Sequence, residues 1–172
     1  MKTCLLVLAF ILVSLNAGAF EFQIEYNAEA VEADKARIEK IEKKVIEIVK
    51  TEAFKDSVVR YNNYSCYNSK NLPQGVRGIQ DVVNHIDKAV AKIKVRFYRT
   101  SPTVLGSTSG NEISFNLNNF ATRSDKAIAN TLFHESLHTL GYGHCGKNNI
   151  RLFPKIKRSV PYKLGDFVEN LY

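Results

Sequence analysis

The most informative stretch of the chain is His134-Glu135-Ser136-Leu137-His138-Thr139-Leu140-Gly141-Tyr142-Gly143-His144. Residues four apart on an α-helix lie on one face, so His134 and His138 can present ring nitrogens to the same ion. Gly141 can adopt a positive φ that ends the helix and turns the chain back, which lets His144 reach that ion too. The stretch therefore predicts a helix that ends at a metal site made of three histidines.

The set of ligands also indicates the chemistry of the metal. Three neutral imidazoles leave one tetrahedral position for water, which is typical of catalytic rather than structural zinc. Glu135 is not needed as a ligand, so its carboxylate can accept a proton from the zinc-bound water and pass it to a leaving amine. The three His, one Glu and one Gly would coincide by chance in about one in 10^5 chains of this length. We therefore expect one catalytic Zn²⁺ per chain and disfavour the alternative of ordinary core or surface histidines.

The same eleven residues resemble the zinc signature of the metzincin metallopeptidases at every defining position. More narrowly, residues 110–120 (GNEISFNLNNF), the helix after them and the segment Leu140–His144 resemble the layout of matrixin catalytic domains. This resemblance, which covers about residues 94–146, implies that 112–117 is an edge strand that lines the substrate cleft and binds an extended peptide through its backbone. It also implies an α+β, metzincin-like domain with a small twisted sheet.

The chain departs from the metzincin pattern in the turn that lies beneath the metal in that family. Its only methionine is Met1, so the methionine of that turn is missing. The segment Ser159-Val160-Pro161-Tyr162 resembles the turn, which implies Pro161 as the floor of the site and Tyr162 as a hydrogen-bond donor to the oxyanion. The alternative is that this segment is an ordinary loop. The second, structural zinc of matrixins has no ligands here, because His85 is the only spare histidine. His85 is expected to be a helix-surface residue.

The N-terminus has the features of a secretory signal peptide. Lys2 precedes an apolar run from Leu5 to Val13, and the small residues Ala17-Gly18-Ala19 follow. The apolar run is shorter than the roughly 18 to 20 residues of a membrane-spanning helix, so an anchor is the less favoured alternative. We expect residues 1–19 to be removed by cleavage after Ala19 and residues 20–172 to form a single domain. The product is expected to be secreted, extracellular or periplasmic, with no membrane anchor.

The charge of the chain is basic but mixed in sign. The formal net charge is +7, and it becomes +6 without residues 1–19, because Lys2 is the only charged residue there and 23 bases then face 17 acids. Lysines and glutamates alternate over residues 32–50, which is typical of a solvated helix face and not of a nucleic-acid patch. The expected partner is therefore a peptide or protein substrate, with no nucleic acid, and the protein is expected to be a monomer.

Two cysteines remain after removal of the predicted signal peptide. They are Cys66 and Cys145. Disulfides persist in exported proteins, so we expect a Cys66–Cys145 bridge, with two unpaired thiols as the alternative.

Periodicity and turn-forming residues place the remaining elements. We expect, in chain order, an amphipathic helix over 28–59, a loop over 60–78, a helix over 79–93, strands over 94–99 and 112–117, the zinc helix over 124–140 and a short C-terminal helix from about Asp166. In the second strand Ile113, Phe115 and Leu117 should share one face, because side chains alternate along a strand.

These observations predict a secreted zinc metalloendopeptidase that hydrolyses peptide bonds by Glu-assisted attack of zinc-bound water. One alternative is a non-catalytic secreted zinc-binding protein with a degenerate metzincin site. The presence of Glu135 argues against that alternative, because a purely structural zinc has no use for an adjacent base. Another is a zinc hydrolase that acts on a different amide, such as a cell-wall crosslink.

Overall fold

The computed structural model of this chain describes residues 20–27, 30–65, 67–68, 70–98, 106–144 and 156–172, without the side chains of 106–108. These residues form six helices and four strands, so the α+β class predicted from the sequence is confirmed. The predicted signal peptide, residues 1–19, lies outside the described residues, and so do Cys66 and Cys145 of the predicted disulfide.

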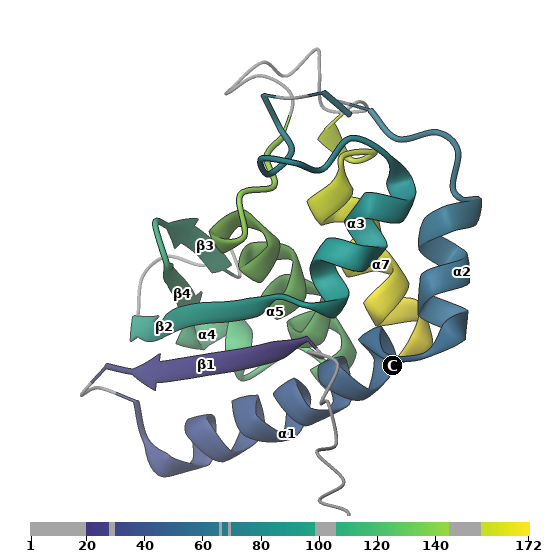
Figure 1. Cartoon of the computed structure of the whole chain (residues 1–172). Coiled ribbons are helices and arrows are strands. Elements are labelled where there is room, and N and C mark those ends of the chain that lie inside the picture. The colour runs from purple at the N-terminus through teal and green to yellow at the C-terminus, as the bar shows by residue number, and fades with distance from the viewer. Residues whose placement is uncertain (1–19, 28–29, 66, 69, 99–105, 145–155) are drawn as a thin grey trace, which may run out of the picture.

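A single small sheet packs against helices (Figure 1). In chain order the elements are β1 (Glu21–Tyr26), α1 (Glu32–Val49), α2 (Glu52–Arg60), α3 (Ile79–Asp87), β2 (Val90–Tyr98), β3 (Gly106–Ser109), β4 (Glu112–Asn116), α4 (Leu117–Phe120), α5 (Asp125–Thr139) and α7 (Val160–Leu171). The sheet has the strand order β1-β2-β4-β3, in which β1, β2 and β4 are parallel and β3 is antiparallel to β4. Helix α1 contacts β1, and α5 contacts β2, β3 and β4.

One face of the sheet is buried and the other is exposed. Side chains alternate between the two faces along β2, as the period of a strand requires. Its buried residues are Ala91, Ile93, Val95 and Phe97. Val95 lies in register with the buried Ile113 of β4, so the buried positions of neighbouring strands form one continuous apolar surface. This surface is the base on which α5 packs.

The predicted single helix over 28–59 is wrong, because the chain forms two helices there. Thr51 lies between α1 and α2 with an extended backbone, and its hydroxyl accepts a hydrogen bond from the amide of Phe54 at 3.1 Å. A threonine in this role is an N-cap, which starts a new helix. The break lets α1 pack on β1 and α5 while α2 packs on α3 and α7.

The predicted helix over 79–93 is too long, and the strand after it begins earlier than predicted. Helix α3 ends at Asp87 and β2 begins at Val90, so Val90 and Ile93 belong to the strand. The sequence VAKIKVRFY alternates over its whole length, and burying that alternating face outweighs the helical spacing of its first residues. Strand β1 was not predicted, although its sequence EFQIEY alternates polar and apolar residues in the same way.

The prediction that residues 112–117 form an edge strand of the sheet is wrong. Strand β4 is paired on both sides, and β3 is the edge strand beside it. Ile113 and Phe115 are buried on one face, as predicted. The strand ends at Asn116, whose side chain accepts a hydrogen bond from the amide of Asn118 at 3.1 Å and caps α4. Leu117 therefore begins a helix and does not share the face of the strand.

Aromatic side chains hold α5 in the centre of the core. The ring of Phe133 meets Phe20 and Phe54 edge to face, with ring centroids 5.4 and 5.8 Å apart. All three side chains are buried. Because Phe20 precedes β1 and Phe54 belongs to α2, this contact joins three distant parts of the chain around the helix that carries the histidines.

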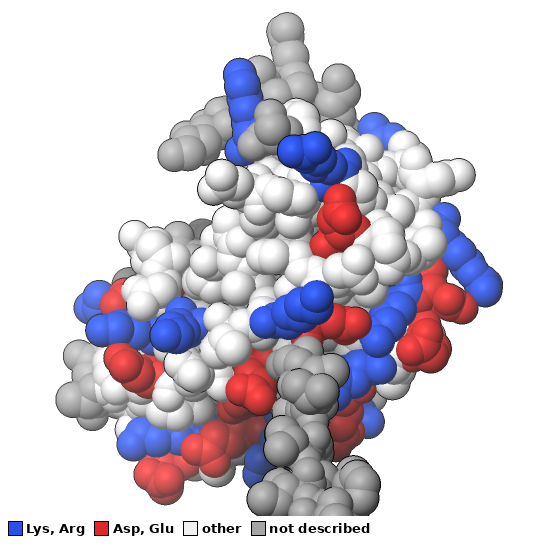
Figure 2. Space-filling view, viewed as in Figure 1, with Lys and Arg blue, Asp and Glu red and all other residues white. Residues whose placement is uncertain are grey.

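Charged groups of both signs lie side by side on the surface (Figure 2). Across the exposed face of the sheet, Lys94 pairs with Glu25 at 3.4 Å and Arg96 pairs with Glu112 at 3.8 Å. That face is therefore a mixture of acids and bases. In the part of the chain that the structure describes, no helix is long and apolar enough to cross a membrane.

Candidate metal centre

Helix α5 presents its histidines at its C-terminal end. The predicted helix over 124–140 is confirmed as Asp125–Thr139, with Ser124 as its N-cap. Gly141 has a φ of 92°, as predicted, and its amide donates to the carbonyl of His138 at 3.0 Å. A left-handed residue at this place is the usual end of a helix, and it turns the chain back toward the last turn.

The turn brings His144 to the two histidines of the helix. The ring of His144 lies 4.5 Å from the ring of His138 and 5.1 Å from that of His134, measured between centroids. One potential ligand atom from each of the three residues lies within 4.8 Å of the other two. Three imidazoles at this separation are close enough to bind one metal ion. Imidazole suits zinc, copper, iron and nickel, so the cluster is compatible with zinc without being specific for it.

A backbone carbonyl determines how His138 can bind a metal. Its Nδ1 lies 2.7 Å from the carbonyl oxygen of Tyr142. Because a carbonyl only accepts, Nδ1 must carry the hydrogen, and Nε2 keeps its lone pair for a metal. A second contact of this kind involves His144, whose Nδ1 lies 2.7 Å from the hydroxyl oxygen of Ser159. Partners on the second ring nitrogen are usual for metal-binding histidines, because they orient the ring.

Burial keeps two of the histidines neutral. It lowers the pKa of His134 to about 3, with a smaller contribution from the neighbouring His138 and His144. It also lowers the pKa of His144 to about 4, with a smaller contribution from His138. Neutral imidazole is the form that binds a metal, so at neutral pH these two side chains need not lose a proton before binding.

Glu135 and Tyr162 lie beside the histidine cluster. Glu135 is partly buried and follows His134 directly in α5. The ring of Tyr162 lies 4.4 Å from that of His134 and 4.9 Å from that of His144, measured between centroids. Burial raises the pKa of Tyr162, and the negative charges of Glu135 and then Asp166 raise it further. The phenol is therefore protonated at neutral pH and can donate a hydrogen bond.

The segment over 159–162 is neither the predicted turn nor a loop, because it begins a helix. Helix α7 runs from Val160 to Leu171, so the prediction of a helix that starts only at about Asp166 is wrong. Pro161 lies buried in the first turn of α7, where its missing amide hydrogen costs no hydrogen bond. The early start of α7 places Tyr162 beside the histidine rings.

Helices α5 and α7 approach each other closely where Gly165 faces Asn130. A β-carbon on Gly165 would lie 3.2 Å from the backbone oxygen of Asn130 and still closer to its side-chain oxygen. The amide of Asn130 also donates to Glu169 at 2.7 Å. This contact is one of those that hold α7, which begins after Ser159 and carries Tyr162, against α5.

Three contributors to the centre were missed in the sequence. His85 was expected on the surface, but it is partly buried and its Nδ1 lies 2.9 Å from the hydroxyl of Tyr142. The backbone oxygen of Asn71, in the predicted loop, accepts a hydrogen bond from the amide of Gly143 at 2.9 Å. Ser159 was noted only as part of a turn. None of these contacts has a signal in local spacing, because each joins residues 15 or more positions apart.

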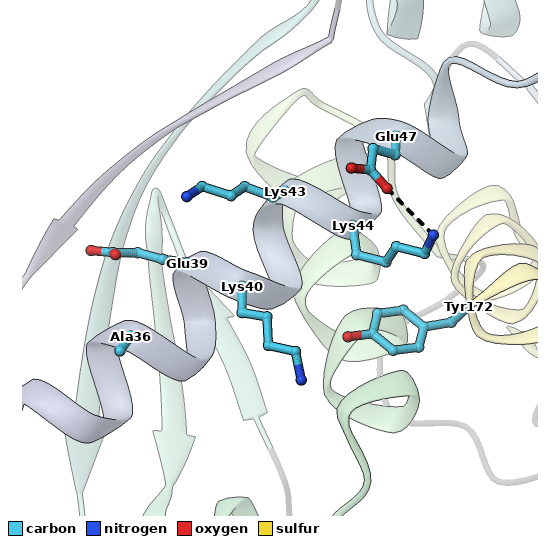
Figure 3. A pocket seen from close by; sticks show the side chains of 7 residues that line it. All are labelled: Ala36, Glu39, Lys40, Lys43, Lys44, Glu47 and Tyr172. Atoms are coloured by element: carbon cyan, nitrogen blue, oxygen red, sulfur yellow. Dashed lines mark hydrogen bonds and ion pairs between the residues drawn. The ribbon is translucent and has the colours of Figure 1, made fainter.

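A hollow lies elsewhere on the molecule, and none of the histidines lines it. It has a volume of about 520 Å³ and lies between α1 and the C-terminal residue, where Lys40 and Lys44 face Tyr172 (Figure 3). Lys44 is bound there to Glu47 at 3.3 Å. The hollow is lined by flexible, solvated side chains, so its size does not make it a site.

No protein-family model, no curated protein and no solved structure matches this chain.

Proposed function

We propose that this chain is a secreted zinc metalloendopeptidase of the metzincin type. The observation that carries the proposal is the convergence of His134, His138 and His144, with Glu135 beside them. A structural zinc usually has four protein ligands, whereas a catalytic zinc has three and an open position. Three histidines with an adjacent carboxylate therefore support catalysis better than a structural role. Secretion rests on the signal-peptide pattern of residues 1–19.

The chain supplies the ligands, a base and a proton donor in this proposal. The three histidines would hold the ion, His138 and His144 through Nε2, because Nδ1 of each contacts another group. When bound, zinc would polarise the substrate carbonyl and increase the acidity of water. Glu135 would accept the proton of the attacking water and deliver it to the leaving nitrogen. Tyr162, which stays protonated, would donate a hydrogen bond to the developing oxyanion.

One observation favours a second function, which is zinc binding without catalysis. The resemblance to metzincins implies a turn with a methionine beneath the metal, whereas this chain has Pro161 within a helix. A site that keeps its ligands and has lost this support could bind zinc and be inactive. The two functions predict the same metal content and differ in the role of Glu135.

The test compares the purified protein with its Glu135→Gln variant on a diverse peptide library, with and without a chelator. The glutamine keeps the shape of the side chain but cannot accept the proton, so cleavage should fall about 10^2-fold to 10^4-fold. Zinc content should not change, because Glu135 is not a ligand. Glu47→Gln on the exposed side of α1 is the matched control and should cleave like the unmodified protein.

The outcomes separate the two functions. Cleavage by Glu135→Gln at the rate of the unmodified protein would show that Glu135 is not the base. Zinc binding with no cleavage of any peptide would favour the non-catalytic function. Well-folded protein that contains no zinc at neutral pH would contradict both.

A further inference from the structure

Ser159 is a fully buried polar side chain directly before α7. Its exposed fraction is 0%, and its hydroxyl oxygen lies 2.7 Å from Nδ1 of His144. Its backbone carbonyl accepts the first helical hydrogen bond of α7, from the amide of Lys163 at 3.0 Å. Ser159 is therefore tied through its backbone to a helix and through its side chain to a candidate metal ligand.

A comparison with Ser124 shows that the hydroxyl of Ser159 is used in an unusual way. Both serines are N-cap residues with nearly the same backbone, φ −67° and ψ 154° at Ser124 and φ −70° and ψ 158° at Ser159. The hydroxyl of Ser124 accepts from the amide of Ala127 and caps α5. The hydroxyl of Ser159 makes no capping hydrogen bond to α7. Serine is favoured at N-caps because of that bond. At Ser159 the bond is absent, and the hydroxyl contacts His144 instead.

His144 has more need of such a partner than the other two histidines. His134 and His138 belong to α5, whose backbone hydrogen bonds fix their position. His144 follows the turn at Gly141 and lies outside the helix. A ring on such a segment is oriented only if another element holds its second nitrogen. Ser159 is the side chain placed to do this.

We propose that Ser159 is a positioning residue that accepts a hydrogen bond from Nδ1–H of His144 and so leaves the lone pair of Nε2 directed at the metal centre. The opposite arrangement, in which the hydroxyl donates to Nδ1, would put the hydrogen on Nε2 and block binding. The role in metal binding rests on the proposed zinc site. The choice of tautomer rests on it too, because a hydroxyl can either donate or accept, but the tautomer can be measured in the protein without metal.

The first test reads the tautomer of His144 in chelator-treated protein by long-range ¹⁵N–¹H NMR near pH 7.5, where an ordinary histidine is neutral. The unmodified protein should show hydrogen on Nδ1 and none on Nε2. Ser159→Ala should lose this preference, whereas Ser124→Ala should retain it. Hydrogen on Nε2 in the unmodified protein would overturn the proposal without the use of any variant.

The second test measures zinc affinity by competition with a chromophoric chelator, together with the visible spectrum of the Co²⁺-loaded protein. Ser159→Ala should bind zinc about 10-fold to 100-fold more weakly and change the Co²⁺ spectrum, as expected when the partner behind a ligand is removed. Ser124→Ala should change neither. Equal affinities and spectra for the two variants would overturn the role in metal binding. A protein that binds zinc as expected but cleaves no peptide would contradict only the proposed enzyme activity.

Discussion

The two ends of α5 are held in opposite ways. At its N-terminal end, Arg37 of α1 donates from Nε to Asp125 at 2.9 Å and from Nη1 to the carbonyl of Phe120 at 2.6 Å. Lys40 reaches the other oxygen of Asp125 at 3.0 Å. A negative charge in the first turn also suits the helix dipole. At its C-terminal end the same helix carries His134, which burial keeps neutral.

The difference indicates that the charged groups at the N-terminal end of α5 contribute to stability, whereas the histidines at its C-terminal end are suited to ligand binding. Charges at the N-terminal end are partly exposed, and they join α1 to α5 without needing a ligand. Protonated histidines would suit the dipole at the C-terminal end, yet only neutral ones can bind a metal. Substitutions at the first end should therefore change the free energy of unfolding, and substitutions at the second should change metal affinity.

The largest expected effect is that of His138→Ala on metal binding. Removal of one of three ligands should weaken zinc binding by more than about 100-fold, because loss of a partner behind a ligand already costs about 10-fold to 100-fold. Lys126→Ala is the matched control, since Lys126 is an exposed residue of the same helix and lies outside the cluster. Isothermal titration of both variants measures the difference. Equal affinities would show that the three histidines do not form the site.

The opposite end of α5 is tested by Arg37→Ala. This change removes three hydrogen bonds from a charged group, which include one to the carbonyl of Arg123. The free energy of unfolding should fall by about 2 kcal/mol, because hydrogen bonds to charged groups contribute roughly 1.5 to 3 kcal/mol and the side chain is partly exposed. Lys40→Ala should cost less, since its side chain is 73% exposed. Urea unfolding with a chelator present gives both values. A large loss of zinc affinity in Arg37→Ala would show that the two ends of α5 do not have separate roles.

The end of α5 that carries the histidine cluster could be predicted from the sequence because local geometry determines it. The spacing of His134 and His138 fixes their common face, and Gly141 fixes the place where the helix ends. The predicted bounds of the helix differ from the observed ones by one residue at each end. The three-histidine cluster follows from these local features alone.

The supports of the site could not be predicted in this way. The hydrogen bond between Tyr142 and His85 joins residues 57 positions apart, and that between His144 and Ser159 joins residues 15 apart. No local period connects such pairs, because they depend on how α3 and α7 pack. Other misses had a local cause. The prediction of one helix over 28–59 includes Thr51, although its side chain can cap a new helix.

The neutral histidines should make the metal-free protein less stable as the pH falls. Burial lowers the pKa of His134 to about 3 and that of His144 to about 4, and it also lowers the pKa of His85. Below the ordinary histidine pKa of about 6.5, the unfolded chain binds protons that the folded chain does not, so stability falls. Above that value these histidines are neutral in both states and add nothing to the pH dependence of stability.

The matched variant for this effect is His134→Gln. Each buried histidine can contribute up to about 1.4 kcal/mol per pH unit, so the variant should lose less stability than the unmodified protein when the pH falls from about 7.5 to about 5.5. Urea unfolding in the presence of a chelator measures the free energy at each pH. Parallel curves for the two proteins would show that His134 is as readily protonated in the folded state as in the unfolded state.

The smallest expected effect is that of Tyr142→Phe, which tests how far the support of the metal centre extends. Only the carbonyl of Tyr142 contacts His138, whereas its hydroxyl bonds to His85 at 2.9 Å. Loss of the hydroxyl should reduce the free energy of unfolding by about 0.5 to 1 kcal/mol, the usual value of one hydrogen bond. Zinc affinity should change less than in Ser159→Ala, because the hydroxyl does not touch a ligand.

A double-mutant cycle with His85→Leu determines whether this small effect comes from the bond itself. Tyr142 is 1% exposed, so either single change leaves a polar group at or near the core without its partner. The double variant should therefore lose less stability than the sum of the two single variants. Additive losses would show that the two side chains act independently. The support of His138 would then end at the backbone of Tyr142, and the histidine cluster at the end of α5 would depend on fewer distant contacts than its geometry indicates.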